Sequence, residues 1–120
     1  MRLAEFLGLG ARFGWKIKVT ALVPCNRPDV PSAPFPEERY KEFCAQLMEK
    51  GLGWQRHPDV LGGWPAPDGR EVQELCRRYV TLVDPAVADE VTGGLENFIL
   101  DRFHQEAACI TQEAVRTTRF

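Results

Sequence analysis

The sequence predicts one small α+β domain, and three patterns along the chain lead to that prediction. Residues 15–23 alternate in hydrophobicity with a period of two, residues 36–50 and 85–104 repeat apolar positions every three to four residues, and residues 65–69 form a turn signal. A chain of 120 residues has the usual length of one domain. It can bury roughly two-thirds of its unfolded surface, so neither a disulfide nor a metal is needed for folding.

The first strand is predicted at residues 15–23. Apolar side chains at every second position give it one buried face. Residues 24–36 contain five prolines, which predict an extended loop because proline fixes φ and lacks a hydrogen-bond donor. The residues of the buried face are Ile17, Val19, Ala21 and Val23.

The first helix is predicted from Pro36 to Lys50. Proline suits the first helical position, and the two glutamates that follow it favour the positive end of the helix dipole. Gly51 suits the left-handed residue that ends a helix. The stripe expected to face the core consists of Tyr40, Phe43, Cys44 and Leu47.

An antiparallel hairpin is predicted next. Residues 52–64 supply a strand that Pro58 and the pair Gly62-Gly63 make irregular. Residues 65–69 form the turn, and residues 71–83 form a long strand that ends in β-branched residues.

The second helix is predicted to begin at Asp84 and Pro85, as a cap followed by a proline in the first turn. Helical spacing of apolar residues continues to about His104. The segment 108–120, rich in threonine and β-branched residues, predicts a final strand.

The resulting order is strand, helix, strand, strand, helix, strand. With right-handed crossovers this is the ferredoxin-like β-α-β-β-α-β plan, in which two helices cover one face of a four-stranded antiparallel sheet. We expect a single domain at 15–120, preceded by an N-terminal arm at 1–14 that packs on its own domain or on a partner subunit. An alternative is that the arm or an edge strand is exchanged between subunits.

Composition restricts the possible partners. A formal net charge of −2 and a pI of about 5.7 argue against nucleic-acid binding through a general positive field. No stretch approaches the roughly 20 apolar residues of a membrane span, so no membrane partner is predicted. The N-terminus lacks a secretory pattern, and the expectation is a soluble, cytoplasmic protein.

No metal or cofactor is predicted. The four cysteines contain no C-x-x-C pair, and the two histidines stand far apart in the sequence. We expect free, buried or half-buried thiols. Cys76 has arginines at the next two positions, which could lower its thiol pKa, although a core thiol explains it equally simply. No phosphate-binding or dinucleotide-binding motif is present.

The uncovered face of the predicted sheet needs water, a ligand or a partner. Arg77 or Arg78, together with Tyr79, is expected to line that face, and Trp64 adds apolar area. Domains of this fold class often cover their open face by pairing with a second copy, and aromatic residues are enriched in protein interfaces, so by this analogy we expect a homodimer.

Two short segments carry the candidate catalytic residues. At the end of the second helix, His104 with Glu106 nearby could form a general base and its orienting partner, although cations also suit a helix C-terminus. In the first hairpin strand, His57 precedes an acid by two residues and could be half of a ligand site, although a surface turn explains it as well.

The second half of the chain also carries a resemblance. The residues concerned are Gly63-Trp64, the turn 68–71, Leu82 to Pro85, Arg102-Phe103-x-Gln105-Glu106, Val115 and Phe120. In these positions, roughly 52–120, the chain resembles a family of small bacterial ferredoxin-like domains of unknown function. It departs from that family in the proline-rich loop and in the N-terminal arm. The resemblance implies the same topology and singles out Arg102, Gln105 and Glu106 as possible binding residues.

Two functions remain open on the sequence. The first is a small soluble binding or interaction module for an unknown ligand, dimeric through its sheet. The alternative is a small cofactor-free enzyme, of the isomerase or oxygenase kind, with a pocket between sheet and helices. His104 pointing into a pocket favours the enzyme, and His104 at a solvated helix end favours the module.

Overall fold

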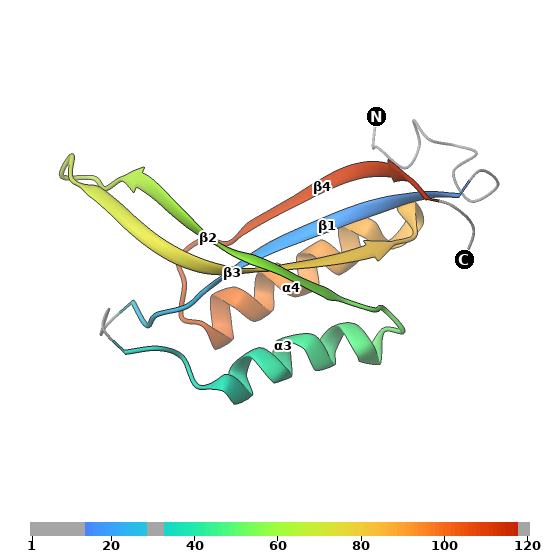
Figure 1. The fold of residues 1–120 in the computed structure, drawn as a ribbon, viewed down its shortest axis with the longest axis horizontal. Coiled ribbons are helices and arrows are strands. Elements are labelled where there is room, and N and C mark those ends of the chain that lie inside the picture. The colour runs from blue at the N-terminus through green and yellow to red at the C-terminus, as the bar shows by residue number, and fades with distance from the viewer. Residues whose placement is uncertain (1–13, 29–32, 118–120) are drawn as a thin grey trace.

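The computed structural model describes residues 14–28 and 33–117, which form a four-stranded antiparallel sheet with two helices on one face (Figure 1). The sheet order is β2-β3-β1-β4. The elements along the chain are β1 (Trp15–Pro24), α3 (Glu37–Glu49), β2 (Gln55–Pro65), β3 (Glu71–Val83), the 3₁₀ turn η1 (Pro85–Val87), α4 (Ala88–Arg102) and β4 (Cys109–Arg116). The predicted α+β class, element order and helix-covered sheet are confirmed, whereas the predicted arm lies outside the described residues except for Gly14.

The core lies between the sheet and the helices. Every second residue of β1 points toward the helices, and Ile17, Val19, Ala21 and Val23 are each at most 1% exposed, as predicted. The two helices contribute apolar stripes at helical spacing, including the predicted Tyr40, Phe43, Cys44 and Leu47.

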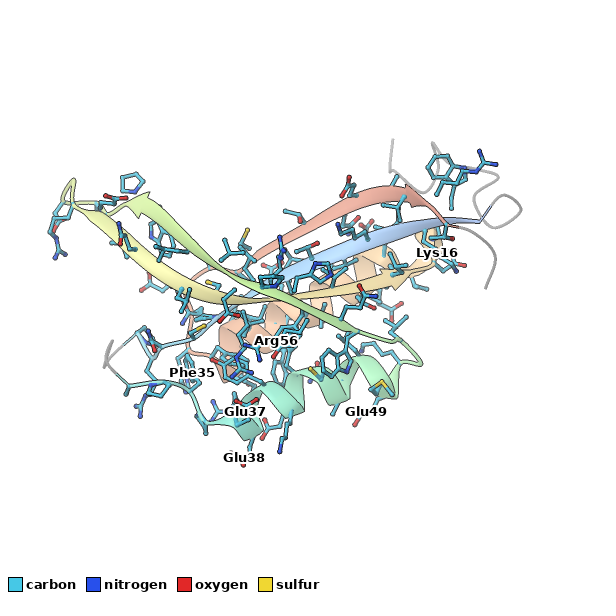
Figure 2. All side chains as sticks on the ribbon, in the orientation of Figure 1. Lys16, Phe35, Glu37, Glu38, Glu49 and Arg56 are labelled. Carbon is cyan, nitrogen blue, oxygen red and sulfur yellow. The ribbon has the colours of Figure 1, made fainter. Side chains whose placement is uncertain are left out.

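Helix α3 begins at Glu37, with Pro36 as the residue before the first turn. The two glutamates lie in that first turn, and Gly51 adopts a φ of 74° directly after the helix, as expected for a left-handed terminator. Figure 2 shows Glu37 and Glu49 at opposite ends of this helix, with Phe35 just before it. The Phe35 ring packs edge-on against Phe103 at 4.9 Å, which closes one end of the core.

The start of the second helix differs from the prediction in detail. The Asp84 carboxylate accepts a hydrogen bond from the Ala86 N–H at 2.9 Å, so the cap forms, but Pro85–Val87 is a 3₁₀ turn and α4 begins at Ala88. The helix ends at Arg102, two residues before the predicted end. His104 lies beyond the helix with a φ of 53°. This left-handed conformation is incompatible with a right-handed α-helix.

The β2–β3 hairpin is longer than the rest of the sheet. The last residue pair between β1 and β3 is Pro24 with Cys76, followed by a hydrogen bond from the Cys25 N–H to the Leu75 carbonyl at 3.0 Å, so residues 71–74 of β3 extend beyond β1 and pair with β2. This part of the hairpin curves away from the helices (Figure 1). Its turn is closed by hydrogen bonds between Ala66 and Arg70 at 2.8 Å and between Gly69 and Ala66 at 2.9 Å. The overhanging hairpin forms one wall of the site described next.

Candidate functional site

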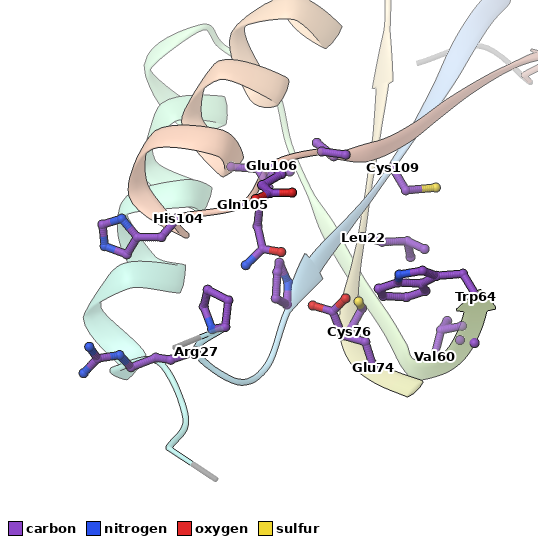
Figure 3. A pocket seen from close by; sticks show the side chains of 17 residues that line it. Leu22, Arg27, Val60, Trp64, Glu74, Cys76, His104, Gln105, Glu106 and Cys109 are labelled. Carbon is purple, nitrogen blue, oxygen red and sulfur yellow. The ribbon is translucent and has the colours of Figure 1, made fainter. Parts of the chain in front are cut away.

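A groove with a volume of about 1180 Å³ lies where the overhanging hairpin, the end of β1 and the α4–β4 connection meet (Figure 3). We call it the hairpin groove. It is lined mainly by apolar side chains, with a few polar groups among them. Its lining residues are Leu22, Pro24, Arg27, Pro28, Val60, Gly62, Gly63, Trp64, Glu74, Cys76, Ile99, His104, Gln105, Glu106, Ala107, Ala108 and Cys109.

The floor of the groove belongs to the sheet face that the helices leave uncovered. In β1 and β3 the even-numbered residues lie on this face, because the odd-numbered ones point into the core. Leu22 therefore lies on the floor with Glu74 and Cys76, in the register that places Pro24 opposite Cys76.

A β-bulge brings Trp64 to the same face. The register of β2 against β3 shifts between His57, which pairs with Arg78, and Val60, which pairs with Cys76. From one pair to the next the chain advances three residues along β2 but only two along β3, so β2 contains one extra residue. Because side chains alternate between faces, this extra residue reverses the face to which every later residue of β2 points. Pro58, which lacks a ladder donor, lies within this shift. Without the bulge, Trp64 would lie on the opposite face from Glu74.

Trp64 supplies the large aromatic surface of the groove. Its side chain is 44% exposed, and its indole extends across the floor toward Glu74 (Figure 3). Gly62, directly opposite Glu74 in the ladder, leaves space between them, because a Cβ added there would have no atom within 4 Å. The indole face and the carboxylate are therefore both open to a bound molecule.

Glu74 is the acidic group on the floor. The Glu74 side chain is half-buried among apolar neighbours, and this burial raises the pKa of its carboxyl. Within the described part of the chain, Glu74 makes neither an ion pair nor a side-chain hydrogen bond. Arg27 and His104 line the rim, and both side chains point away from the centre of the groove (Figure 3). Among residues 14–28 and 33–117, the carboxylate therefore faces the groove without a cation paired to it.

The α4–β4 connection forms the opposite wall. Gln105 points toward the groove (Figure 3), and its side-chain amide donates a hydrogen bond to the Phe103 carbonyl at 2.8 Å. The left-handed backbone at His104 turns the chain, so His104 is exposed on the outside and Gln105 lies inside. His104 and Glu106 share no hydrogen bond among the described residues, which leaves the predicted base-and-carboxylate pair unformed.

The other predicted site residues are dispersed. Tyr79 was expected on the uncovered face and lies instead in the core, 3% exposed against Phe43, because adjacent strand residues point to opposite faces and Arg78 takes the outer one. Arg102 pairs with Glu42 at 2.7 Å on the helix surface, away from the groove. Of the five predicted binding residues, only Trp64 and Gln105 meet in the hairpin groove.

Arg78 and His57 lie next to each other farther along the uncovered sheet face. The His57 ring nitrogen Nε2 is 3.3 Å from the Gln55 side-chain oxygen. The Arg78 Nε is buried and has no hydrogen-bond partner within the described residues. A buried donor without a partner costs free energy.

The cysteines are free thiols. Cys76 lies on the groove floor, where burial, followed by the charge of Glu74, raises its pKa to about 12. The alternative of a thiol activated by neighbouring arginines is therefore wrong, because burial dominates: Arg77 points to the other face of the strand, and Arg78, on the same face, does not offset the burial. Cys109 is exposed, which corrects the expectation that all four thiols are buried or half-buried.

Neither Glu74 nor Gly62 was singled out from the sequence as a site residue. Glu74 stands two residues before Cys76 in a strand, so period two predicts that the two residues share a face, whereas the register against β1 decides which face that is. Its position beside Trp64 was not predictable, because it depends on the bulge.

Neither a metal site nor a membrane span is found in the described parts of the chain. Residues 14–28 and 33–117 contain no group of three or more His, Cys, Asp or Glu side chains placed to hold a metal ion. Within the same residues, neither helix is long and apolar enough to cross a membrane.

The similarity of this chain to known proteins lies in its structure. No protein-family model matches the chain, and no curated protein does. Among solved structures, the chain is similar to a phage SAM lyase in complex with S-methyl-5′-thioadenosine, with a TM-score of 0.55 and 15% sequence identity. The match covers 85% of this chain and 90% of that chain. At this identity the similarity shows a shared fold.

Proposed function

We propose that this chain is a ferredoxin-like domain that binds a small organic molecule in the hairpin groove. The antiparallel order β2-β3-β1-β4, with both helices on one face, supports the ferredoxin-like topology. The similarity of the second half to small bacterial domains of unknown function remains part of this proposal.

The single observation that carries the proposal is the combination of Trp64, Glu74 and Gln105 around one apolar space. Small-molecule sites are typically concave, apolar and roughly 300–1,000 Å³ in volume, with a few polar groups that orient the ligand. The hairpin groove is slightly larger and partly open to solvent. Its indole offers a stacking surface, and its carboxylate and amide offer hydrogen bonds.

The structural neighbour suggests the first ligand to try. That phage SAM lyase holds S-methyl-5′-thioadenosine, a molecule with a flat heteroaromatic ring and an apolar thioether. A ring of this type fits the exposed face of Trp64, and an exocyclic amine suits a carboxylate or amide acceptor.

The test is calorimetric titration of the purified chain with S-methyl-5′-thioadenosine. We expect saturable binding that Trp64→Ala weakens at least about tenfold, because the stacking surface is lost. Trp54→Ala is the matched control, since Trp54 has a similar exposure of 42% but packs against Tyr79 outside the groove. Equal loss in both variants would argue against the groove as the binding site.

A small cofactor-free enzyme is the second candidate, favoured by the raised pKa of Glu74 in an apolar site. Burial that raises the pKa of a carboxyl favours its neutral form, which can donate a proton to a bound substrate. The exposed position of His104 favours the binding module instead. Incubation with SAM, followed by chromatography for S-methyl-5′-thioadenosine, separates the two: product formed by the wild type and absent with Glu74→Gln would establish the enzyme.

The homodimer expected from the sequence is also proposed, through the uncovered sheet face near Arg78. Leu82 is an exposed apolar residue on this face, at the end of β3 away from the groove. Light scattering of the wild type and of Leu82→Glu tests this proposal, with a dimeric mass expected for the first and a monomeric mass for the second.

A further inference from the structure

We propose that the ligand of the hairpin groove carries a permanent positive charge on an onium centre, a sulfonium or a quaternary ammonium, held between the Trp64 indole and the Glu74 carboxylate. This inference rests on the proposed function and specifies the class of small molecule. Three features of the groove lead to it.

The first feature is that Glu74 has no counter-ion within the described part of the chain. Burial is the cause that raises the pKa of its carboxyl, with no neighbouring charge contributing to the shift. A carboxylate that is partly removed from water and left unpaired is unfavourable, and an incoming cation relieves that cost. A ligand of negative charge would add repulsion at the same place.

The second feature is the position of the indole. Trp64 and Glu74 are diagonal neighbours on the same face, since Trp64 pairs with Val72 and Glu74 pairs with Gly62. Tryptophan is the side chain that attracts cations most strongly through its ring face. A cation placed above Gly62 would therefore meet an aromatic face on one side and a carboxylate on the other.

The third feature is the apolar character of the rest of the groove. Leu22, Val60 and Ala108 line it without offering hydrogen-bond acceptors from their side chains. A primary ammonium is strongly hydrated and would lose part of that hydration against these walls. An onium centre surrounded by carbon groups has no donors to satisfy and suits such walls.

The titratable and charged groups that share the groove with Glu74 also bear on the inference. They are Cys76 on its own strand, Cys109 at the start of β4, Glu106 on the α4–β4 connection, and Arg27 and His104 at the rim. Arg27 and His104 point outward (Figure 3), so a second acid, Glu106, adds to the preference for positive charge.

The experiment compares two probes that differ by one methyl group and one charge. The first is S-methyl-5′-thioadenosine, a neutral thioether, and the second is its S-methylated sulfonium derivative, whose charge does not change with pH. We expect the sulfonium to bind about tenfold more tightly at pH 8. The ratio of the two affinities should fall as pH is lowered toward 4.5, because burial raises the pKa of the Glu74 carboxyl above that value and protonation removes its charge.

Two variants test whether Glu74 causes the preference for the sulfonium. In Glu74→Gln the preference for the sulfonium should disappear while the affinity for the neutral thioether stays within about threefold. Glu106→Gln removes the same charge from an exposed position of the opposite wall and should retain most of the preference. Urea unfolding confirms that both variants are folded before titration.

The outcomes separate this inference from the proposed function. Equal affinity of the wild type for both probes would overturn the onium proposal and leave small-molecule binding intact. A preference that persists in Glu74→Gln would overturn the role of Glu74. Failure of both probes to bind would overturn the proposed ligand class for the groove, and the onium proposal with it.

Discussion

The guanidinium carbon of Arg77 lies 3.7 Å from the ring centroid of Tyr40. The same guanidinium donates to both carboxylate oxygens of Glu37, at 2.7 and 3.0 Å, and to the Tyr79 hydroxyl at 3.3 Å. The Tyr40 hydroxyl in turn donates to the carbonyl of Pro24 at 2.6 Å. These contacts join β3 and the first turns of α3 to the end of β1, where one wall of the hairpin groove begins.

We predict that Arg77→Ala lowers the free energy of unfolding by about 1–2 kcal/mol, because a bidentate ion pair, a ring contact and packed methylene groups are lost together. Arg102→Ala is the matched control. Arg102 also pairs with a glutamate at 2.7 Å, but its side chain is 44% exposed, compared with 16% for Arg77. Its loss should cost at most about 0.5 kcal/mol. Urea unfolding measures both, and equal effects would contradict the prediction.

Glu74→Gln should stabilise the fold at neutral and alkaline pH. The pKa of Glu74 is raised in the folded state, so its favourable contribution is fully present below the unfolded value of about 4.5 and is lost as pH rises through the folded value. The variant should therefore unfold at higher urea concentration at pH 8, with the difference vanishing near pH 4. A variant that is more stable and yet loses cation preference is typical of a residue kept for function.

Glu37→Gln should change stability in the opposite direction to Glu74→Gln. Its hydrogen bonds with Arg77 lower the pKa of the Glu37 carboxyl, so its contribution is present above the unfolded value and lost as pH falls through the folded value. This variant should be less stable than the wild type at pH 7, and the gap should close on acidification. The same pH dependence in both glutamate variants would show that the two environments have been wrongly assigned.

Gly62→Val should abolish ligand binding without harming the fold. Position 62 lies in a strand, where glycine is unfavourable and a β-branched residue is preferred, and an added Cβ meets no atom within 4 Å. The new side chain would fill the space between Trp64 and Glu74. Leu61→Ala, at the adjacent exposed position on the other face, should bind normally. Calorimetry checks both variants, and unchanged binding by Gly62→Val would place the ligand elsewhere.

The thiols should react at very different rates. Cys109 is exposed, whereas burial raises the pKa of Cys25, Cys44 and Cys76 and so depletes their reactive thiolate. Reaction of the native protein with a disulfide reagent at pH 8 should show one fast phase that Cys109→Ser removes. A fast phase that remains in this variant would indicate an accessible thiol among the other three.

The fold was predictable where one local pattern decided it. The alternation in β1 and the stripe of α3 each depend on periodicity within a single segment, and both were predicted with nearly correct bounds. Tyr79 was placed wrongly because a strand shows its two faces only relative to its neighbours, and the buried face of β3 follows from its register against β1.

The candidate site was harder to predict because it depends on two backbone irregularities. The bulge near Pro58 decides that Trp64 and Glu74 share a face. The left-handed residue His104 decides that Gln105 points inward. Neither irregularity follows from residue preferences alone, since Pro58 signals a disturbance without its direction and positive φ is uncommon for any residue other than glycine.

The most direct test of the hairpin groove as a small-molecule site is a ¹H–¹⁵N NMR titration with S-methyl-5′-thioadenosine. The account predicts that the indole N–H of Trp64 and the backbone amides of Glu74 and Gln105 shift together with one saturable dissociation constant. The indole N–H of Trp54 should stay unchanged. Shifts confined to residues outside the groove, or none up to millimolar ligand, would contradict the central claim.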